Sequence, residues 1–187
     1  MASIRYMAQP MCAVPIKPLP IKHYPVEAME TAYIALGANI PSPAGTPRQT
    51  LDAALLRLAG LGRLTARSSY YETAPVGFAN QPTFLNAAAS LETDLAAEDL
   101  LHHLLDIERS FGRDRTHGIP NGPRTLDLDL ILYGDRICNT ENLQLPHPRM
   151  AERSFVLLPL AEIAPARIHP QLLKTMKQLL QDLTDRE

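Results

Sequence analysis

The sequence GPRTLDLDLILY, residues 122–133, alternates apolar and polar side chains from Leu126 to Leu130. Such alternation predicts a β-strand, in which residues two apart point to the same face. Asp127 and Asp129 are therefore expected to project side by side, with the leucines facing the opposite way. Two neighbouring carboxylates repel each other, so the sequence alone suggests that removing one of them relieves a strain.

A cation between the two aspartates would turn this repulsion into binding. Mg²⁺ takes oxygen ligands and is commonly held by one or two carboxylates together with substrate phosphates. Arg124, just before the pair, suits a phosphate oxygen. The alternative is the solvent-exposed face of an ordinary strand, which is the commoner meaning of a bare D-x-D pattern. Aspartate is nevertheless depleted in strands, and the face becomes apolar again at Ile131 and Tyr133, which predicts a strand covered on both sides.

Composition narrows the class of protein. The chain has 187 residues, 45% of them hydrophobic, and a formal net charge of −2. The slight negative charge argues against a nucleic-acid or membrane partner, since both usually require a basic surface. The two cysteines show no metal-binding spacing, and there is no apolar run of about 18 residues and no signal-peptide pattern. A cytoplasmic location is therefore expected.

Residues 1–30 differ from the rest of the chain. They contain Pro10, Pro15, Pro18, Pro20 and Pro25, and proline at this density disfavours both helix and central strand. We expect an extended or disordered tail, followed by a single domain over residues 31–187. Translation could equally begin at the methionine at position 29, and the sequence leaves this open.

The order of predicted elements indicates an α+β fold. Strands are expected at 31–36, 64–73, 84–92 and 126–133, and helices at 48–59 and 96–111. The resulting β-α-β-β-α-β order is the ferredoxin-like arrangement, with two helices on one face of an antiparallel sheet. A short strand at 136–138 and a helix at 150–163 follow, as part of a C-terminal helical extension.

Several motifs in order carry a family resemblance. They are YIALGAN (33–39), SSYYETAP (68–75), QPTFLNAA (81–88), GPRTLDLDL (122–130), PHP (146–148) and RSF (153–155). In these motifs the chain resembles the 6-hydroxymethyl-7,8-dihydropterin pyrophosphokinases of folate biosynthesis. The resemblance implies transfer of pyrophosphate from ATP to the hydroxymethyl group of the pterin, with release of AMP. It also implies two Mg²⁺ ions, ATP as co-substrate, small-molecule partners only, and a monomer.

The resemblance further implies roles for individual residues. Asp127 and Asp129 match the magnesium ligands, and Arg113 and Arg124 match arginines that contact the phosphates during catalysis. The other positions that match the ATP site are Glu108, Arg115, Leu130, His147 and Arg153. Those that match the pterin site are Thr73, Ala74, Val76, Phe84, Asn86, Asn121 and Phe155.

Several of these positions have a structural alternative. Arg113 and Arg115 could be solvated loop residues, and His147 could have a structural role. The two phenylalanines could be core residues, and Glu108 could be a solvent-facing helix residue. The chain also departs from the family pattern, with Asn121 where a tryptophan is usual and further differences at Leu105, Pro120, Asn142 and Pro148. The loops 74–82 and 113–124, rich in Gly and Pro, are predicted to be mobile lids.

Two other functions were weighed. A ferredoxin-like RNA-binding module would carry an aromatic-rich sheet and a basic face, whereas this chain has 5% aromatic residues and an acidic strand. A catalytically inactive relative would lose key positions, but the aspartate pair, Arg124, Asn86 and Phe155 are all present. An active enzyme is therefore expected.

Overall fold

The computed structural model describes residues 29–114 and 121–186. Arg115 and residues 1–28 of the predicted tail therefore lie outside the described residues, whereas the last two tail positions, 29 and 30, are described. The elements in chain order are β1 (Glu30–Ala38), α1 (Pro47–Leu58), β2 (Arg63–Arg67), β3 (Tyr71–Thr73), β4 (Phe84–Thr93), α2 (Ala97–Ser110), β5 (Asp127–Tyr133), β6 (Cys138–Asn139), β7 (Gln144–Leu145), a 3₁₀ turn (Met150–Glu152), α3 (Ser154–Ile163) and α4 (Met176–Thr184).

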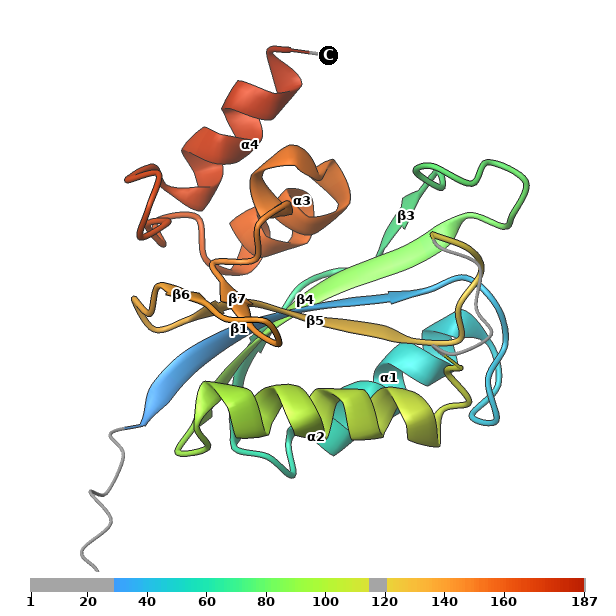
Figure 1. Ribbon diagram of the computed structural model, residues 1–187. Helices are drawn as coiled ribbons and strands as arrows, with labels where there is room; N and C mark the ends of the chain where they lie inside the picture. Colours follow the sequence, from blue (N-terminus) through green and yellow to red (C-terminus); the bar gives the residue numbers. More distant parts are fainter. Residues whose placement is uncertain (1–28, 115–120, 187) are drawn as a thin grey trace, which may run out of the picture.

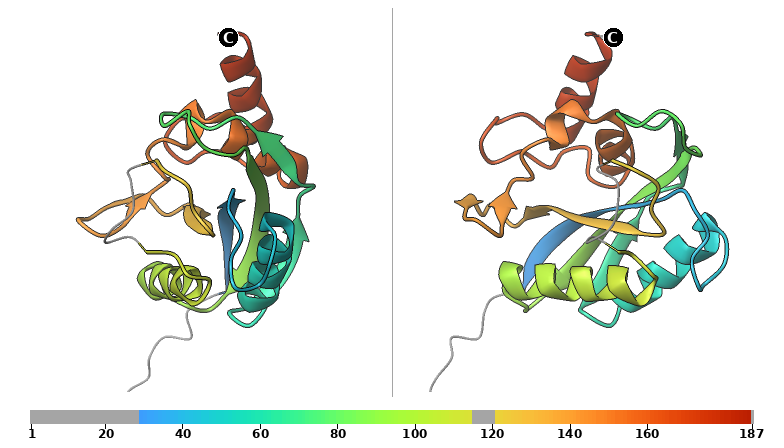
Figure 2. Two further views of the ribbon diagram at one scale, coloured as in Figure 1. Left: turned by 90° about the vertical axis from the view of Figure 1, so that its right-hand side faces the viewer. Right: turned by 45° about the vertical axis from the view of Figure 1, so that its right-hand side comes forward.

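The main sheet confirms the ferredoxin-like prediction. Its strand order is β2-β4-β1-β5, with β3 also pairing with β4, and every pairing is antiparallel. Helices α1 and α2 cover one face of the sheet, and α3 and α4 lie on the other (Figure 1). The side views in Figure 2 show the same three layers. Among the described residues, no helix is long and apolar enough to cross a membrane.

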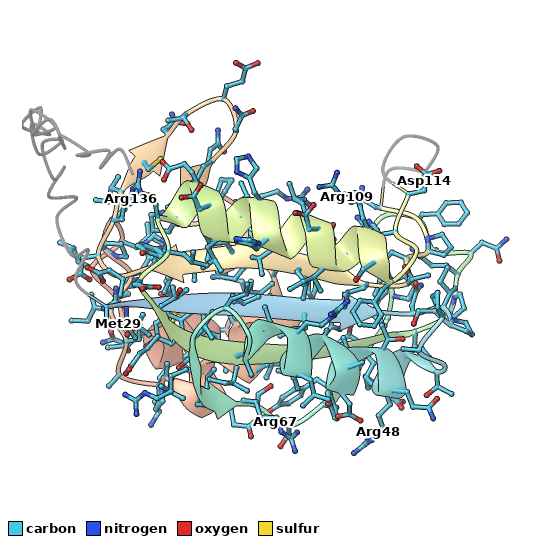
Figure 3. The ribbon with its side chains drawn as sticks, turned by 90° about the horizontal axis from the view of Figure 1, so that it is seen from below. Met29, Arg48, Arg67, Arg109, Asp114 and Arg136 are labelled. Carbon is cyan, nitrogen blue, oxygen red and sulfur yellow. The ribbon has the colours of Figure 1, made fainter. Side chains whose placement is uncertain are left out.

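Each face of the sheet has its own hydrophobic core. The core on the α1 and α2 side includes Leu51, Leu58, Leu100 and Leu104, all fully buried. Helix α1 begins with a capping box, in which the Thr46 hydroxyl accepts from the Gln49 N–H and the Gln49 side chain accepts in return. Figure 3 looks onto these two helices, with the exposed side chains of Arg48 and Arg109 at their surface. The smaller core on the other face joins α3 and α4 to the sheet.

Strand β5 has the predicted alternation, with one exception. Leu126, Leu128 and Leu130 pack in the core on the α1 and α2 side, and Ile131 packs in the opposite core. The register against β1 shifts between Tyr33 and Ile34, so the alternation fails beyond Ile131. Tyr133 therefore packs with the leucines and not, as the period of two predicts, with the face that carries the aspartates.

Two predicted elements are broken in the structure. The expected strand at 64–73 is two strands, β2 and β3, because Ser68 turns the chain and its hydroxyl accepts from the Ala88 N–H at 2.9 Å. The expected helix at 150–163 is a 3₁₀ turn followed by α3, with Arg153 in an extended conformation between them (φ −121°, ψ 104°). The expected strand at 136–138 is displaced to β6, which forms a small hairpin with β7.

Candidate active site

The candidate site lies on the sheet face that α3 covers, and its floor is one row of residues across three strands. Gly37 of β1 pairs with Asn86 of β4 on one side and with Asp127 of β5 on the other. Paired residues of adjacent strands point to the same face, so Asn86 and Asp127 stand on either side of a position without a side chain. Two interstrand spacings separate their Cα atoms by about 10 Å. The missing side chain at Gly37 leaves space on the sheet between them where a flat ligand can lie.

Gly37 is needed at the centre of this row. A Cβ atom at this position would lie 3.1 Å from Asn86 Oδ1 and 4.0 Å from Asp127 Cβ. The glycine therefore leaves room for the Asn86 carboxamide. Asn86 is 5% exposed, and its Nδ2 donates to Thr73 Oγ1 at 2.7 Å. Thr73 thus fixes the amide orientation, so that the amide oxygen is available as an acceptor.

Two arginines bind Asp127. Arg113 Nη2 lies 3.1 Å from Oδ1, and Arg124 Nη1 lies 2.6 Å from Oδ2. The three side chains are between 14% and 20% exposed, so the cluster is largely shielded from solvent. Arg113 also donates to the Leu126 carbonyl at 3.2 Å. The repulsion expected between the two aspartates is therefore offset by arginine partners.

The break before α3 brings a second arginine–aromatic pair to the site. Arg153 lies 3.9 Å from Asp129 Oδ2, and its guanidinium carbon is 5.5 Å from the centre of the Phe155 ring. On the sheet, the guanidinium of Arg124 lies 5.3 Å from the Phe84 ring centre. Each predicted pterin-stacking ring thus lies next to an arginine of the predicted nucleotide side, which links the two halves of the site.

His147 lies beside the site as a neutral imidazole. Burial, together with the charges of Arg153 and Arg149, lowers its pKa to about 4. Its Nδ1 accepts from the Arg149 backbone N–H at 3.2 Å. The ring proton is therefore assigned to Nε2, which makes His147 a hydrogen-bond donor to an anion.

Glu108 is buried, so the alternative prediction of a solvent-facing helix residue is wrong. It is 1% exposed, and its Oε1 accepts from the Leu128 N–H at 2.8 Å. Leu128 lies between the two aspartates on the outermost strand of the sheet. Glu108 therefore holds the β5 backbone at the point where both aspartates leave it.

The loop 74–82 is tied to the chain that leads into β5. The Asn39 amide donates to Gln81 Oε1 and to the Pro82 carbonyl, both at 3.0 Å, and its oxygen accepts from the Arg124 N–H at 2.8 Å. Gln81 donates in turn to the Asn121 carbonyl at 2.8 Å. Asn121 has φ +56°, a conformation that asparagine tolerates better than other side chains, so asparagine at this position suits the turn.

A carboxylate on α3 fixes the opposite wall. Glu162 accepts from the Ser69 N–H and hydroxyl at 3.0 Å and from the Tyr71 hydroxyl at 2.7 Å. This hydrogen bond raises the pKa of Tyr71. Glu162 thus ties helix α3, which carries Phe155, to strand β3, which carries Thr73.

A single pocket gathers most of the predicted site residues. Its lining includes ten of them: Thr73, Ala74, Val76, Phe84, Asn86, Asn121, Arg124, Asp127, Arg153 and Phe155. Arg113 and Asp129 contact the lining residues Asp127 and Arg153, and His147 accepts from the N–H of the lining residue Arg149. Glu108 contacts Leu128, which does not line the pocket. Leu130 does not line the pocket, because its side chain is 4% exposed and packs in the core. Sequence reasoning assigned no role to three further lining residues, Gly37, Gly77 and Arg149; the motif YIALGAN contains the first of them.

The donor set suits magnesium. No group of three or more His, Cys, Asp or Glu side chains that could hold a metal occurs in the described parts of the chain, so a site built from protein ligands alone is not formed there. Two carboxylates on one face, with arginines around them, match the way Mg²⁺ is held by few protein ligands together with phosphates and water. Asp127 and Asp129 therefore fit the ion.

Comparison with known proteins agrees with this geometry. The family model described as 7,8-dihydro-6-hydroxymethylpterin-pyrophosphokinase (HPPK) matches residues 33–165. Two curated relatives are named 2-amino-4-hydroxy-6-hydroxymethyldihydropteridine pyrophosphokinase. The Haemophilus influenzae protein is 44% identical over 144 residues, which is 76% of this chain and 86% of the relative. The Bacillus subtilis protein is 47% identical over 132 residues, 71% and 77% of the two chains.

Solved structures agree on the fold. The crystal structure of wild-type Plasmodium falciparum HPPK-DHPS with pteroate superposes with a TM-score of 0.66 at 15% sequence identity. The match covers 85% of this chain but 43% of that larger protein. The family model covers more than half of the chain, and two relatives exceed 40% identity over most of their length. This chain belongs to the 7,8-dihydro-6-hydroxymethylpterin-pyrophosphokinase family.

Proposed function

We propose that the pocket divides the family reaction between its two sides, with the pterin over the Asn86 side and the triphosphate over the Asp127 side. The chain, as a member of the family, transfers pyrophosphate from ATP to 6-hydroxymethyl-7,8-dihydropterin in folate biosynthesis. The observation that carries the division is the row Asn86–Gly37–Asp127. It places an amide and a carboxylate on one face of the sheet, on strands whose Cα atoms at these two positions are about 10 Å apart.

On the pterin side, Phe84 and Phe155 are proposed to hold the flat ring between them. Asn86, fixed by Thr73, would pair with the pterin edge, because an amide both donates and accepts hydrogen bonds. Ala74, Val76 and Asn121 line the same part of the pocket and would cover the ring and exclude water.

On the phosphate side, Asp127 and Asp129 would hold two Mg²⁺ ions. When bound, these ions would neutralise charge on the triphosphate. Arg113 and Arg124, which bind Asp127 in the described structure, could then move onto phosphate oxygens. Arg153 and the Nε2–H of His147 would add further donors, Glu108 would keep the β5 backbone in place, and Arg115 and Leu130 remain proposed nucleotide contacts.

The transfer itself requires positioning more than covalent help. The hydroxymethyl oxygen forms a bond to the β-phosphorus of ATP. The bond from that phosphorus to the oxygen bridging the α-phosphorus breaks, AMP leaves with this oxygen, and the hydroxyl proton passes to water. The arginines stabilise charge on the phosphoryl oxygens as it develops.

Several features of the surroundings are also proposals. We infer that the protein has no nucleic-acid partner, since the chain has 18 basic and 20 acidic residues and no basic excess, and we propose a monomer, as the family resemblance implies. We also infer a cytoplasmic location and a single domain over residues 31–187. Sedimentation of the purified protein with and without nucleic acid checks the first two.

Separate titrations test the division of the pocket. We expect Asn86→Ala to weaken binding of 6-hydroxymethylpterin roughly tenfold, because a buried polar edge loses its partner at a cost of about 1–3 kcal/mol. The same change should leave binding of a non-hydrolysable ATP analogue with Mg²⁺ within twofold. Asp129→Asn should do the reverse, and Asp106→Asn on the exposed face of α2 serves as control. Equal losses of both ligands in Asn86→Ala would contradict the division.

A further inference from the structure

Arg149 is a pocket-lining cation outside the residues proposed to bind either substrate. It lies in the segment between His147 and the 3₁₀ turn, and its side chain lines the same pocket as Asn86, Phe155 and Asp127. The backbone on either side of it is held firmly. Its own N–H donates to His147 Nδ1 at 3.2 Å, and the next residue, Met150, is fully buried. The guanidinium group therefore starts from a fixed point at the pocket rim.

The charge of Arg149 is not compensated as the other pocket arginines are. Arg113, Arg124 and Arg153 each lie within 4 Å of Asp127 or Asp129. Arg149 forms no ion pair of this kind within residues 29–114 and 121–186. Its positive charge is felt by its neighbours, since it lowers the pKa of Arg153, although burial lowers that pKa more. The Arg149 guanidinium could therefore bind an anion in the pocket without first breaking an ion pair with a carboxylate.

The position of Arg149 indicates which anion it meets. It lines the same pocket as Asn86 and Phe155, which are proposed to hold the pterin, and as Asp127, which is proposed to lie under the triphosphate. The β- and γ-phosphates of ATP are the two that are transferred to the pterin, so these two must reach this part of the pocket. The α-phosphate departs with AMP.

We propose that Arg149 binds the pyrophosphoryl group during its transfer to the pterin and still contacts this group in the bound product. This proposal rests on the proposed function, because it requires the pterin and the triphosphate to share this pocket. An arginine is suited to the task, since its planar fork donates two parallel hydrogen bonds to phosphate oxygens.

Binding of four ligands tests the proposal. Wild type, Arg149→Gln, Arg149→Lys and the control Arg57→Gln are titrated with 6-hydroxymethylpterin, its pyrophosphate ester, AMP and a non-hydrolysable ATP analogue, all with Mg²⁺. Arg57 is a matched control because it is an exposed arginine near the end of α1, on the other face of the sheet. Arg149→Gln should weaken the pyrophosphate ester about tenfold and the ATP analogue severalfold. It should leave 6-hydroxymethylpterin and AMP within twofold, and Arg149→Lys should recover part of the loss.

The outcomes separate a phosphate contact from a structural role. Unchanged affinity for the pyrophosphate ester in Arg149→Gln overturns the proposal, and so does an equal loss for 6-hydroxymethylpterin, which carries no phosphate. A tenfold loss in Arg57→Gln as well would show a general charge effect and would also overturn it. Failure of the proposed function looks different, because wild-type protein would then form no AMP from ATP and the pterin.

Discussion

Replacing Asp127 tests how the pocket is held together before any substrate binds. Repulsion between Asp127 and Asp129 predicts that Asp127→Ala stabilises the free protein. The structure predicts the opposite, because Asp127 accepts from Arg124 at 2.6 Å and lies 3.1 Å from Arg113. Its removal leaves two shielded guanidinium groups facing each other without their shared carboxylate.

The magnitude follows from the shielding of the three side chains. Removing one partner of a buried ion pair costs about 3–5 kcal/mol, whereas exposed pairs contribute about 0–1 kcal/mol. With 14–20% of these side chains exposed, we expect a loss of roughly 2–3 kcal/mol. For a domain of this size, that corresponds to a fall in Tm of roughly 4–12 °C. Asp127→Asn keeps an acceptor oxygen and should lose about half as much.

Thermal and urea unfolding of the ligand-free protein measure this directly. The matched control is Asp106→Ala, since the pair between Asp106 and Arg109 has side chains 60% and 69% exposed and should change Tm little. Because salt screens shielded ion pairs only weakly, the loss of stability in Asp127→Ala should persist at high salt. If Asp127→Ala is as stable as wild type or more so, the arginines do not offset the repulsion, and the description of the pocket is wrong.

Three further predictions concern single positions. Gly37→Ala should weaken the binding of 6-hydroxymethylpterin about tenfold in titrations but change Tm by less than a few degrees, because the new Cβ would lie 3.1 Å from the Asn86 amide oxygen. Unaltered pterin affinity would contradict the need for glycine at this position. Glu162→Ala should raise the KM for the pterin severalfold with little change in the KM for ATP, because Glu162 joins the two walls that hold the pterin. Glu162→Gln should recover part of the lost pterin affinity, and equal effects on both substrates would indicate a general loss of structure. The pKa of His147 is lowered to about 4 in the folded protein, chiefly by burial, so the unfolded chain binds a proton at His147 at a higher pH than the folded chain does. The folded protein should therefore lose roughly 1–3 kcal/mol of stability as pH falls from about 6.5 to 4, after allowance for partial exposure of the ring. The stability of His147→Asn should depend less on pH across this window, and identical pH profiles for variant and wild type would refute the assignment.

The sequence was sufficient for those parts of the site that depend on local periodicity. The alternation in β5 placed Asp127 and Asp129 on one face and the leucines on the other, because a period of two is a property of the strand itself. The ferredoxin-like order followed from the succession of elements. Where the local pattern is interrupted, prediction failed, as at the bulge that turns Tyr133 to the other core.

The remaining geometry depends on pairings between distant parts of the chain. The row that joins Asn86, Gly37 and Asp127 is set by the register of three strands, which no local pattern encodes. The break at Arg153 lies inside the segment predicted as one helix, without a Gly or Pro beside it to mark an end, and it is this break that brings Arg153 and Phe155 to the pocket. Arg149 gave no signal in the sequence, because a single arginine after a proline is compatible with any exposed loop.

Product analysis by phosphorus NMR is the most direct test of the central claim, which is pyrophosphoryl transfer in this pocket. Wild-type protein is supplied with ATP, Mg²⁺ and 6-hydroxymethyl-7,8-dihydropterin, in parallel with Asp129→Asn and with the control Asp106→Asn. We predict equimolar AMP and pterin pyrophosphate from wild type and control, no ADP, and almost no product from Asp129→Asn although it remains folded. Formation of ADP, AMP formation that does not depend on the pterin, or full activity in Asp129→Asn would contradict the account.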